Sequence, residues 1–182
     1  MTEEVKQFRD GIFALETRRF GAIGELMVSK LFELRPSGTL AYDLKEKDMR
    51  VECKFCRALQ SHPKSIRANN LITEVLNART EQRLISYYDE SSTWTVNFAQ
   101  IKPECFDVLY FGVFFSDAIL MFKMPSYMVR DIKGYSDKQH RGNKGEGQFS
   151  LKSKDLNEWL SKNIEHWVLD YEQLYQLFQS NG

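Results

Sequence analysis

The order of predicted helices and strands assigns this chain to the mixed α/β or α+β class, with a central mixed sheet flanked by helices. Helix-period apolar stripes recur near both ends of the chain, and short strand-like runs lie between them. The 182 residues are enough for one domain, whose core we place at about residues 17–125. Aromatic residues make up 13% of the chain, a content that disfavours intrinsic disorder.

Residues 2–34 are predicted to be helical, and Pro36 ends the pattern. Residues 40–55 have the pattern of two short strands joined by a polar turn, 57–70 that of a basic loop, and 71–88 that of a second helix. The first helix carries an apolar stripe at the 3.6-residue period, formed by Phe20, Ile23, Met27, Leu31 and Leu34.

Further along the chain, residues 94–98 alternate like a strand, and the apolar run over 107–124 predicts a buried β-hairpin. Residues 134–150 are rich in glycine and charge and are predicted to form one long loop. Residues 153–180 are predicted to form two amphipathic helices, the second opened by an Asp170–Gln173 capping box.

Charge and cysteine content narrow the possible functions. Lys+Arg and Asp+Glu both total 25, so this is not a charge-driven DNA coat, and any nucleic-acid binding must rest on local basic patches. Three cysteines, and a charged N-terminus without an apolar run, favour a reducing, cytoplasmic compartment, and no membrane contact is expected. The longest apolar run, around 108–115, is too short to span a bilayer.

The segment YDLKEKDMRVECKF, residues 42–55, combines a buried strand face with a charged one. Side chains alternate along a strand, so Glu52 and Lys54 share one face. The other face is apolar and carries Val51, Cys53 and Phe55. The strand is therefore expected to bury one side and to present a carboxylate and an ammonium group on the other.

Folding the segment back at Lys47–Asp48 predicts the register of a hairpin. Leu44 then meets Val51 on the core face, and Asp43 meets Glu52 on the polar face with Cβ atoms roughly 5 Å apart. Facing carboxylates repel each other unless a cation lies between them, and oxygen ligands favour a hard divalent ion. The sequence therefore predicts an Mg²⁺ site, which Mn²⁺ could also fill, with Asp43 and Glu52 as ligands.

These residues resemble the motif of the PD-(D/E)xK nuclease superfamily, and specifically its small type II restriction endonucleases. The matching pieces are Asp43, the spacing of nine residues to Glu52, and Glu52-Cys53-Lys54. Tyr42 stands where the motif's name has proline, a position that commonly varies. A helix with the sequence GAIGE precedes the motif, and the family often places a further acidic residue there, for which Glu25 is the candidate.

The resemblance covers residues 20–55 and implies an αβββαβ core, divalent-metal hydrolysis of double-stranded DNA at a short specific site, and usually a homodimer. It implies that Asp43 and Glu52 hold the metal and that Lys54 acts on the water or the phosphate. The setting would be a bacterial or archaeal cell. The alternatives are a nicking or repair endonuclease with the same core, a DNA-binding module with a vestigial site, or an ordinary charged hairpin; the intact motif argues against the vestigial site.

Two basic segments are candidate DNA contacts. Arginine, asparagine and glutamine can contact base edges, and glycines allow close backbone approach to DNA. In the long loop the candidates are Lys138, His140, Arg141, Asn143, Lys144 and Gln148. After the catalytic strand, the candidates for phosphate contact are Arg57, His62, Lys64 and Arg67. The competing interpretation of the long loop is an ordinary solvated segment. Gln100 and Lys102 could reach the phosphate, but we interpret them first as the start of a helix.

Cys53 and Cys56 form a CxxC pattern, but on a strand their sulfurs point to opposite faces and cannot chelate one ion together. A redox CxxC normally lies at a helix N-terminus. Zinc and redox functions are therefore disfavoured.

Overall fold

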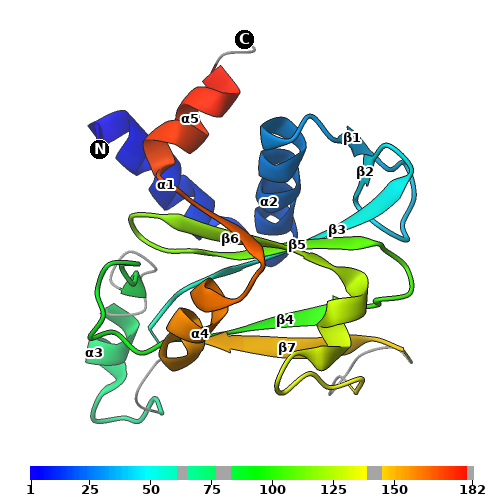
Figure 1. The fold of residues 1–182 in the computed structure, drawn as a ribbon. Helices are drawn as coiled ribbons and strands as arrows, with labels where there is room; N and C mark the ends of the chain where they lie inside the picture. Colours follow the sequence, from blue (N-terminus) through cyan, green and yellow to red (C-terminus); the bar gives the residue numbers. More distant parts are fainter. Residues whose placement is uncertain (61–64, 77–82, 139–144, 180–182) are drawn as a thin grey trace.

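The computed structural model describes residues 1–60, 65–76, 83–138 and 145–179 of the chain. It is a mixed α/β structure whose central sheet is flanked by helices, as the sequence predicts (Figure 1). In chain order the elements are α1 (Glu3–Ala14), α2 (Thr17–Leu31), β1 (Arg35–Pro36), β2 (Leu44–Glu46), β3 (Met49–Arg57), α3 (Leu71–Leu76), β4 (Thr95–Ile101), β5 (Val108–Phe114), β6 (Ile119–Pro125), η2 (Ser126–Asp131), β7 (Gly147–Lys152), η3 (Ser153–Asp155), α4 (Leu156–Ser161), β8 (Glu165–Leu169) and α5 (Tyr171–Gln179).

The main sheet has the strand order β1-β2-β3-β5-β6-β8. Strands β3 and β5 run parallel, whereas the other neighbouring pairs are antiparallel, so the sheet is mixed. Strands β4 and β7 form a separate two-stranded sheet. In Figure 1, α1, α2 and α5 lie on one side of the main sheet, and α4, η2 and the β4–β7 sheet lie on the other.

The main sheet separates two apolar cores, because side chains on successive strand residues point to opposite faces. All seven residues of β5 are buried, which explains why its sequence is a continuous apolar run instead of an alternating one. Leu109 and Phe111 pack towards the β4–β7 side, whereas Tyr110 and Phe114 pack towards α2. The predicted hairpin over residues 107–124 is confirmed as β5 and β6.

The N-terminal segment is two helices instead of the single one predicted over residues 2–34. Helix α1 ends at Ala14, and its C-cap Leu15 has an extended backbone with ψ 146°. The guanidinium of Arg57 donates hydrogen bonds to the carbonyls of Phe13 (2.7 Å) and Leu15 (2.8 Å), two of the groups that a helix end leaves without helical partners. Tertiary contacts with β3 therefore help to end a helix that apolar periodicity alone would continue.

The prediction of a helix over residues 71–88 is also wrong for the second half of this range. Helix α3 ends at Leu76, and of the described residues that follow, Arg83 is in a 3-10 turn while Leu84 and Ile85 lie outside any helix. The Ile85 carbonyl accepts a hydrogen bond from the backbone N–H of Ser116, and Leu84 forms a bridge with Leu59. Pairing with the β5–β6 turn overrides the helical period here.

The C-terminal region contains one strand that the sequence interpretation missed. Strand β8 pairs with β6, its sequence EHWVL having the aromatic and β-branched content typical of strands. The predicted helices on either side are present as α4 and α5. The predicted capping box is confirmed, because Asp170 Oδ1 accepts from the N–H of Gln173 (2.7 Å) and Gln173 Oε1 accepts from the N–H of Asp170 (2.9 Å).

The segment predicted as one loop over residues 134–150 ends as a strand. Residues 147–150 belong to β7, which pairs with β4. Among the described residues, 134–138 and 145–146 lie outside the named helices and strands, and Ser136 forms an isolated bridge with Gln148. None of the helices in the described residues combines the length and apolar character needed to cross a bilayer.

Candidate active site

The β2–β3 hairpin has the register that the sequence predicts. Leu44 pairs with Val51, and the strands are joined by the two-residue turn Lys47–Asp48. Just before β2, Asp43 donates its backbone N–H to the carbonyl of Val51 (3.0 Å), and its Oδ2 accepts the backbone N–H of Cys53 (2.8 Å). Asp43 therefore lies directly alongside the β3 segment that carries Glu52.

Glu52 and Lys54 form an ion pair on the same side of β3. Lys54 Nζ lies 2.5 Å from Glu52 Oε1, and their side chains are 25% and 12% exposed respectively. Burial raises the pKa of the Glu52 carboxyl, Lys54 opposes the rise, and the negative charges of Asp43 and Glu25 add to it. A nearby cation would stabilise the ionised form of a carboxyl group in this setting.

Lys54 is held in its charged form. Burial by itself lowers the pKa of its ammonium group, but the attraction of Glu52 and Asp43 outweighs burial, and the net pKa is raised. At neutral pH this side chain is therefore a cation with three N–H donors. That state suits stabilisation of negative charge better than removal of a proton from water.

Glu25 approaches the motif residues from helix α2. Its side chain is half-buried, and burial together with the charge of Asp43 raises the pKa of its carboxyl, while the ammonium of Lys54 lowers it. Gly24 permits this approach, because a Cβ atom at that position would lie only 2.2 Å from Cδ2 of Phe55 on β3. The close contact between α2 and β3 brings a third carboxylate near the hairpin.

Asp43, Glu52 and Lys54 line one wall of a polar pocket of about 230 Å³. The facing residues come from the ends of β4 and β7 and from the turn before β5. They are Gln100, Lys102, Cys105, Phe106 and Glu146, with Leu40 and Ala41 completing the rim. Lys102 Nζ lies 3.1 Å from Glu146 Oε1, and the Glu146 side chain is only 5% exposed.

This opposite wall was largely missed by sequence reasoning. Gln100 lies in β4 near its end and Lys102 follows the strand directly, so neither starts a helix, contrary to the structural role we gave them. Glu146 lies in a segment that composition predicts to be an ordinary loop. Its position beside Lys102 depends on the pairing of β4 with β7, and no local sequence signal encodes that pairing.

Metal binding at this site would rest on few protein ligands. No group of three or more His, Cys, Asp and Glu side chains suited to holding a metal ion occurs in the part of the chain that the structure describes. Mg²⁺ commonly binds through one or two carboxylates and takes its remaining ligands from water and substrate phosphate. Asp43 and Glu52 fit that smaller requirement, although a cation would compete with Lys54 for Glu52.

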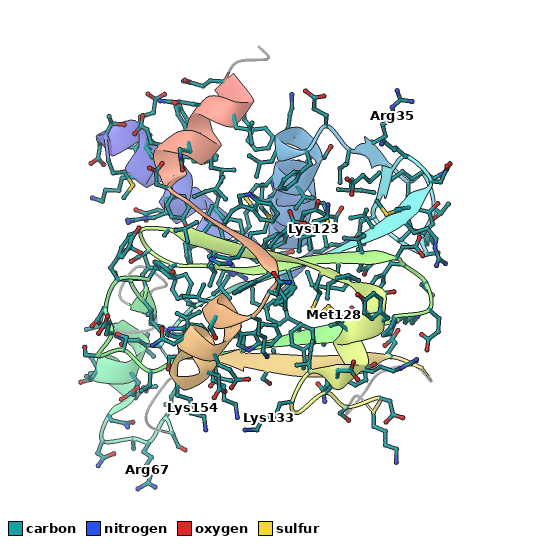
Figure 2. All side chains as sticks on the ribbon, viewed as in Figure 1. Arg35, Arg67, Lys123, Met128, Lys133 and Lys154 are labelled. Atoms are coloured by element: carbon teal, nitrogen blue, oxygen red, sulfur yellow. The ribbon has the colours of Figure 1, made fainter. Side chains whose placement is uncertain are left out.

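Two other hollows of the described structure are larger. One, of about 260 Å³, is lined around Trp159 by four lysines and two carboxylates; they are Lys133, Lys152, Lys154, Lys162, Asp155 and Glu158, and Figure 2 labels Lys133 and Lys154. The other, of about 340 Å³, lies between Phe55, Arg57 and β4 and is mainly apolar. The smaller pocket is the one that contains Asp43, Glu52 and Lys54, the residues that the sequence motif selects.

The two cysteines of the CxxC pattern do lie in different environments, as predicted. Cys53 is buried in the core beneath α2, whereas Cys56 packs against the other core and donates its S–H to the carbonyl of Asn97 (3.3 Å). Burial raises the pKa of both thiols, that of Cys56 to about 12. All three cysteines of the chain are free.

The predicted DNA contacts are only partly described. Arg57 is engaged with α1 carbonyls and stacks over Phe20, with its guanidinium carbon 4.6 Å from the ring centroid, so we do not assign it to DNA. Arg67 is exposed, on the opposite side of the view from β2 (Figure 2). Lys138 is exposed, and its carbonyl accepts from Gln148 Nε2 (3.3 Å). The remaining candidates lie outside the described residues; they are His62, Lys64, His140, Arg141, Asn143 and Lys144.

Comparison of this chain with family models, with curated proteins and with solved structures finds no match.

Proposed function

We propose that this chain is a metal-dependent endonuclease of the PD-(D/E)xK superfamily that hydrolyses phosphodiester bonds at a short specific site in double-stranded DNA, as type II restriction endonucleases do. The observation that carries the proposal is the meeting of Glu25, Asp43, Glu52 and Lys54 from helix α2 and the β2–β3 hairpin. These are the residues that the resemblance selects, and α2 and β3 bring them together.

The arrangement of elements supports the same proposal. The segment α2-β1-β2-β3 is a helix followed by an antiparallel meander, and after α3 the chain returns in β5, parallel to β3. That order agrees with the αβββαβ core implied by the resemblance. Strand β4 is an insertion in this scheme, and α3 is a short helix without buried residues.

Hydrolysis adds one water molecule across a P–O ester bond. The site must bind the phosphate, stabilise its growing negative charge and accept a proton from the water. A divalent ion bound by Asp43 and Glu52 would supply Lewis-acid chemistry and orient the phosphate. The ammonium of Lys54 stabilises negative charge, and the nearby carboxylates are the candidate proton acceptors.

Removing the charges at β3 tests this proposal. We expect Glu52→Ala and Lys54→Ala each to lower cleavage of duplex DNA by at least about 10²-fold, because each removes a group acting on the reacting phosphate. Binding of DNA and the thermal midpoint of unfolding should change much less. Exposed Lys45, next to the hairpin turn but outside the pocket, provides the control Lys45→Ala, which should cleave normally. Full cleavage by either pocket variant would refute the assignment.

The homodimer that the resemblance implies remains a prediction. Sedimentation of the protein with and without duplex DNA would test it, since a symmetric site cut on both strands calls for two copies.

A further inference from the structure

The backbone at the end of β4 departs from regular strand geometry next to the pocket. The pairing of β4 with β7 shifts register between Phe98 and Ile101, and Gln100, between them, has φ 58°. A left-handed conformation at a residue other than glycine costs about 1 kcal/mol or more. Bulges of this kind redirect side chains and recur next to active sites. Here the bulge directly precedes Lys102 and places Gln100 on the pocket wall.

Lys102 is anchored at this wall and remains accessible. Its ammonium pairs with the buried Glu146 carboxylate at 3.1 Å, while its own side chain is 43% exposed. One N–H bond to Glu146 leaves donor capacity on a group that has three. An ion pair with a buried carboxylate is weak evidence for a stabilising role, because desolvation offsets much of the attraction. The ammonium of Lys102 is held in place, remains accessible and faces the motif residues. We therefore expect it to bind a ligand.

The chemistry of the two walls defines that ligand. Asp43 and Glu52 suit a cation, whereas Lys102 and Gln100 offer N–H donors and positive charge to an anionic oxygen. Lysine is a common point-charge partner of phosphate. We infer that Lys102, held by Glu146 beside Gln100, is a second phosphate-binding cation of the pocket, facing Lys54, and that it positions a backbone phosphate of DNA. This assignment rests on the proposed function.

The salt dependence of DNA binding tests the assignment separately from cleavage. Each phosphate neutralised by the protein contributes about one unit to the slope of log affinity against log salt. A fluorescent duplex of mixed sequence is titrated at fixed Ca²⁺, which replaces Mg²⁺ as the ion. We expect Lys102→Met to lower the slope by about one unit and Lys102→Arg to restore it. The control Lys6→Met removes an exposed lysine of α1 that also pairs with a glutamate, and should keep the wild-type slope.

Lys102→Met leaves the buried Glu146 carboxylate less compensated, so the double variant Lys102→Met with Glu146→Gln is measured beside it. The double variant should fold with the wild-type thermal midpoint and show the same reduced slope. If the wild type binds and cuts DNA but Lys102→Met and the double variant both keep its slope, the Lys102 assignment fails alone. A loss of slope equal in Lys6→Met would also overturn it. If the wild type binds no duplex, this assignment and the proposed function fail together.

Discussion

At the level of single residues, successive side chains of β3 point to opposite faces of the sheet. One face lines the pocket and the other packs in the core. Glu52 and Lys54 reach the pocket, whereas Cys53 between them is buried with Val51 in the core beneath α2. This division could be predicted because it depends on neighbours in sequence. The Lys102–Glu146 pair could not, since its two members are brought together by strands distant in sequence.

The aspartate that binds metal should be Asp43 and not Asp48. Asp43 is tied to the backbone of β3 beside Glu52, whereas Asp48 is exposed in the hairpin turn. We expect Asp43→Asn to abolish the heat of Mn²⁺ binding in a calorimetric titration and to remove cleavage. Asn can still accept the N–H of Cys53, so the fold should persist.

Asp48→Asn is the matched control for that titration and should retain metal binding and most of the cleavage. If Asp48→Asn lost the ion and Asp43→Asn kept it, the metal site would have to be rebuilt around the turn.

Cys105 offers a chemical probe of the pocket. It is partly exposed in the pocket wall, whereas Cys53 is buried and burial raises the pKa of Cys56 to about 12. Because the thiolate is the reactive form, a maleimide at neutral pH should modify Cys105 first. The bulky adduct should block DNA cleavage, as read by mass spectrometry and a cleavage assay on the same sample. Cys105→Ser should be active and resistant; an adduct at Cys105 that leaves cleavage intact would argue against this pocket as the active site.

At the scale of elements, two glycines of α2 should respond in opposite ways to the same substitution. A Cβ at Gly24 would overlap the Phe55 ring, whereas nothing lies within 4 Å of the corresponding position at Gly21. We expect Gly24→Ala to destabilise the fold by about 1–3 kcal/mol and to displace Glu25. Gly21→Ala should instead stabilise it by about 0.5–1 kcal/mol, because alanine favours the helix interior.

Urea unfolding of both glycine variants measures these changes. Equal effects at the two positions would show that α2 does not approach β3 as closely as described.

The starts of β3 and β5 are joined by an ion pair with a defined pH dependence. Arg50 Nη2 lies 2.7 Å from Asp107 Oδ1, and the hydrogen bonds from the Arg50 side chain and backbone lower the pKa of Asp107 from 3.8 to about 2. A depressed folded-state pKa adds stability above the unfolded pKa, and that stability is lost as pH falls through the folded pKa. The thermal midpoint of Asp107→Asn should therefore lie below that of the wild type near neutral pH.

That difference should shrink below pH 3.8 and vanish only below about pH 2. A difference that stays constant down to pH 2 would mean that the Asp107 charge does not contribute to stability.

The elements that sequence reasoning found are those with local determinants. The hairpin of β5 and β6 has long apolar runs, and α5 has its capping box. The failures have nonlocal causes: Leu84 pairs with Leu59, Ile85 is bonded to the β5–β6 turn, and β8 depends on pairing with β6. In these segments, hydrogen bonds to backbone that is distant in sequence outweigh the local helical periodicity.

At the scale of the whole molecule, the pocket lies where two sheets meet. The main sheet supplies Asp43, Glu52 and Lys54, and the β4–β7 side supplies Lys102 and Glu146. A chain with zero formal net charge lacks general attraction for DNA. If the chain acts on DNA as proposed, recognition must depend on such local groups, which would suit a nuclease that should release non-target sequence.

The central claim is that this chain hydrolyses DNA with a divalent metal at the Asp43–Glu52–Lys54 pocket. The most direct measurement is gel electrophoresis of unmethylated phage DNA after incubation with purified protein and Mg²⁺, beside samples with EDTA and with Glu52→Ala. We expect discrete bands with the wild type and Mg²⁺ only. Intact DNA in every lane over a range of Mg²⁺ and Mn²⁺ concentrations, or equal cutting by Glu52→Ala, would contradict it.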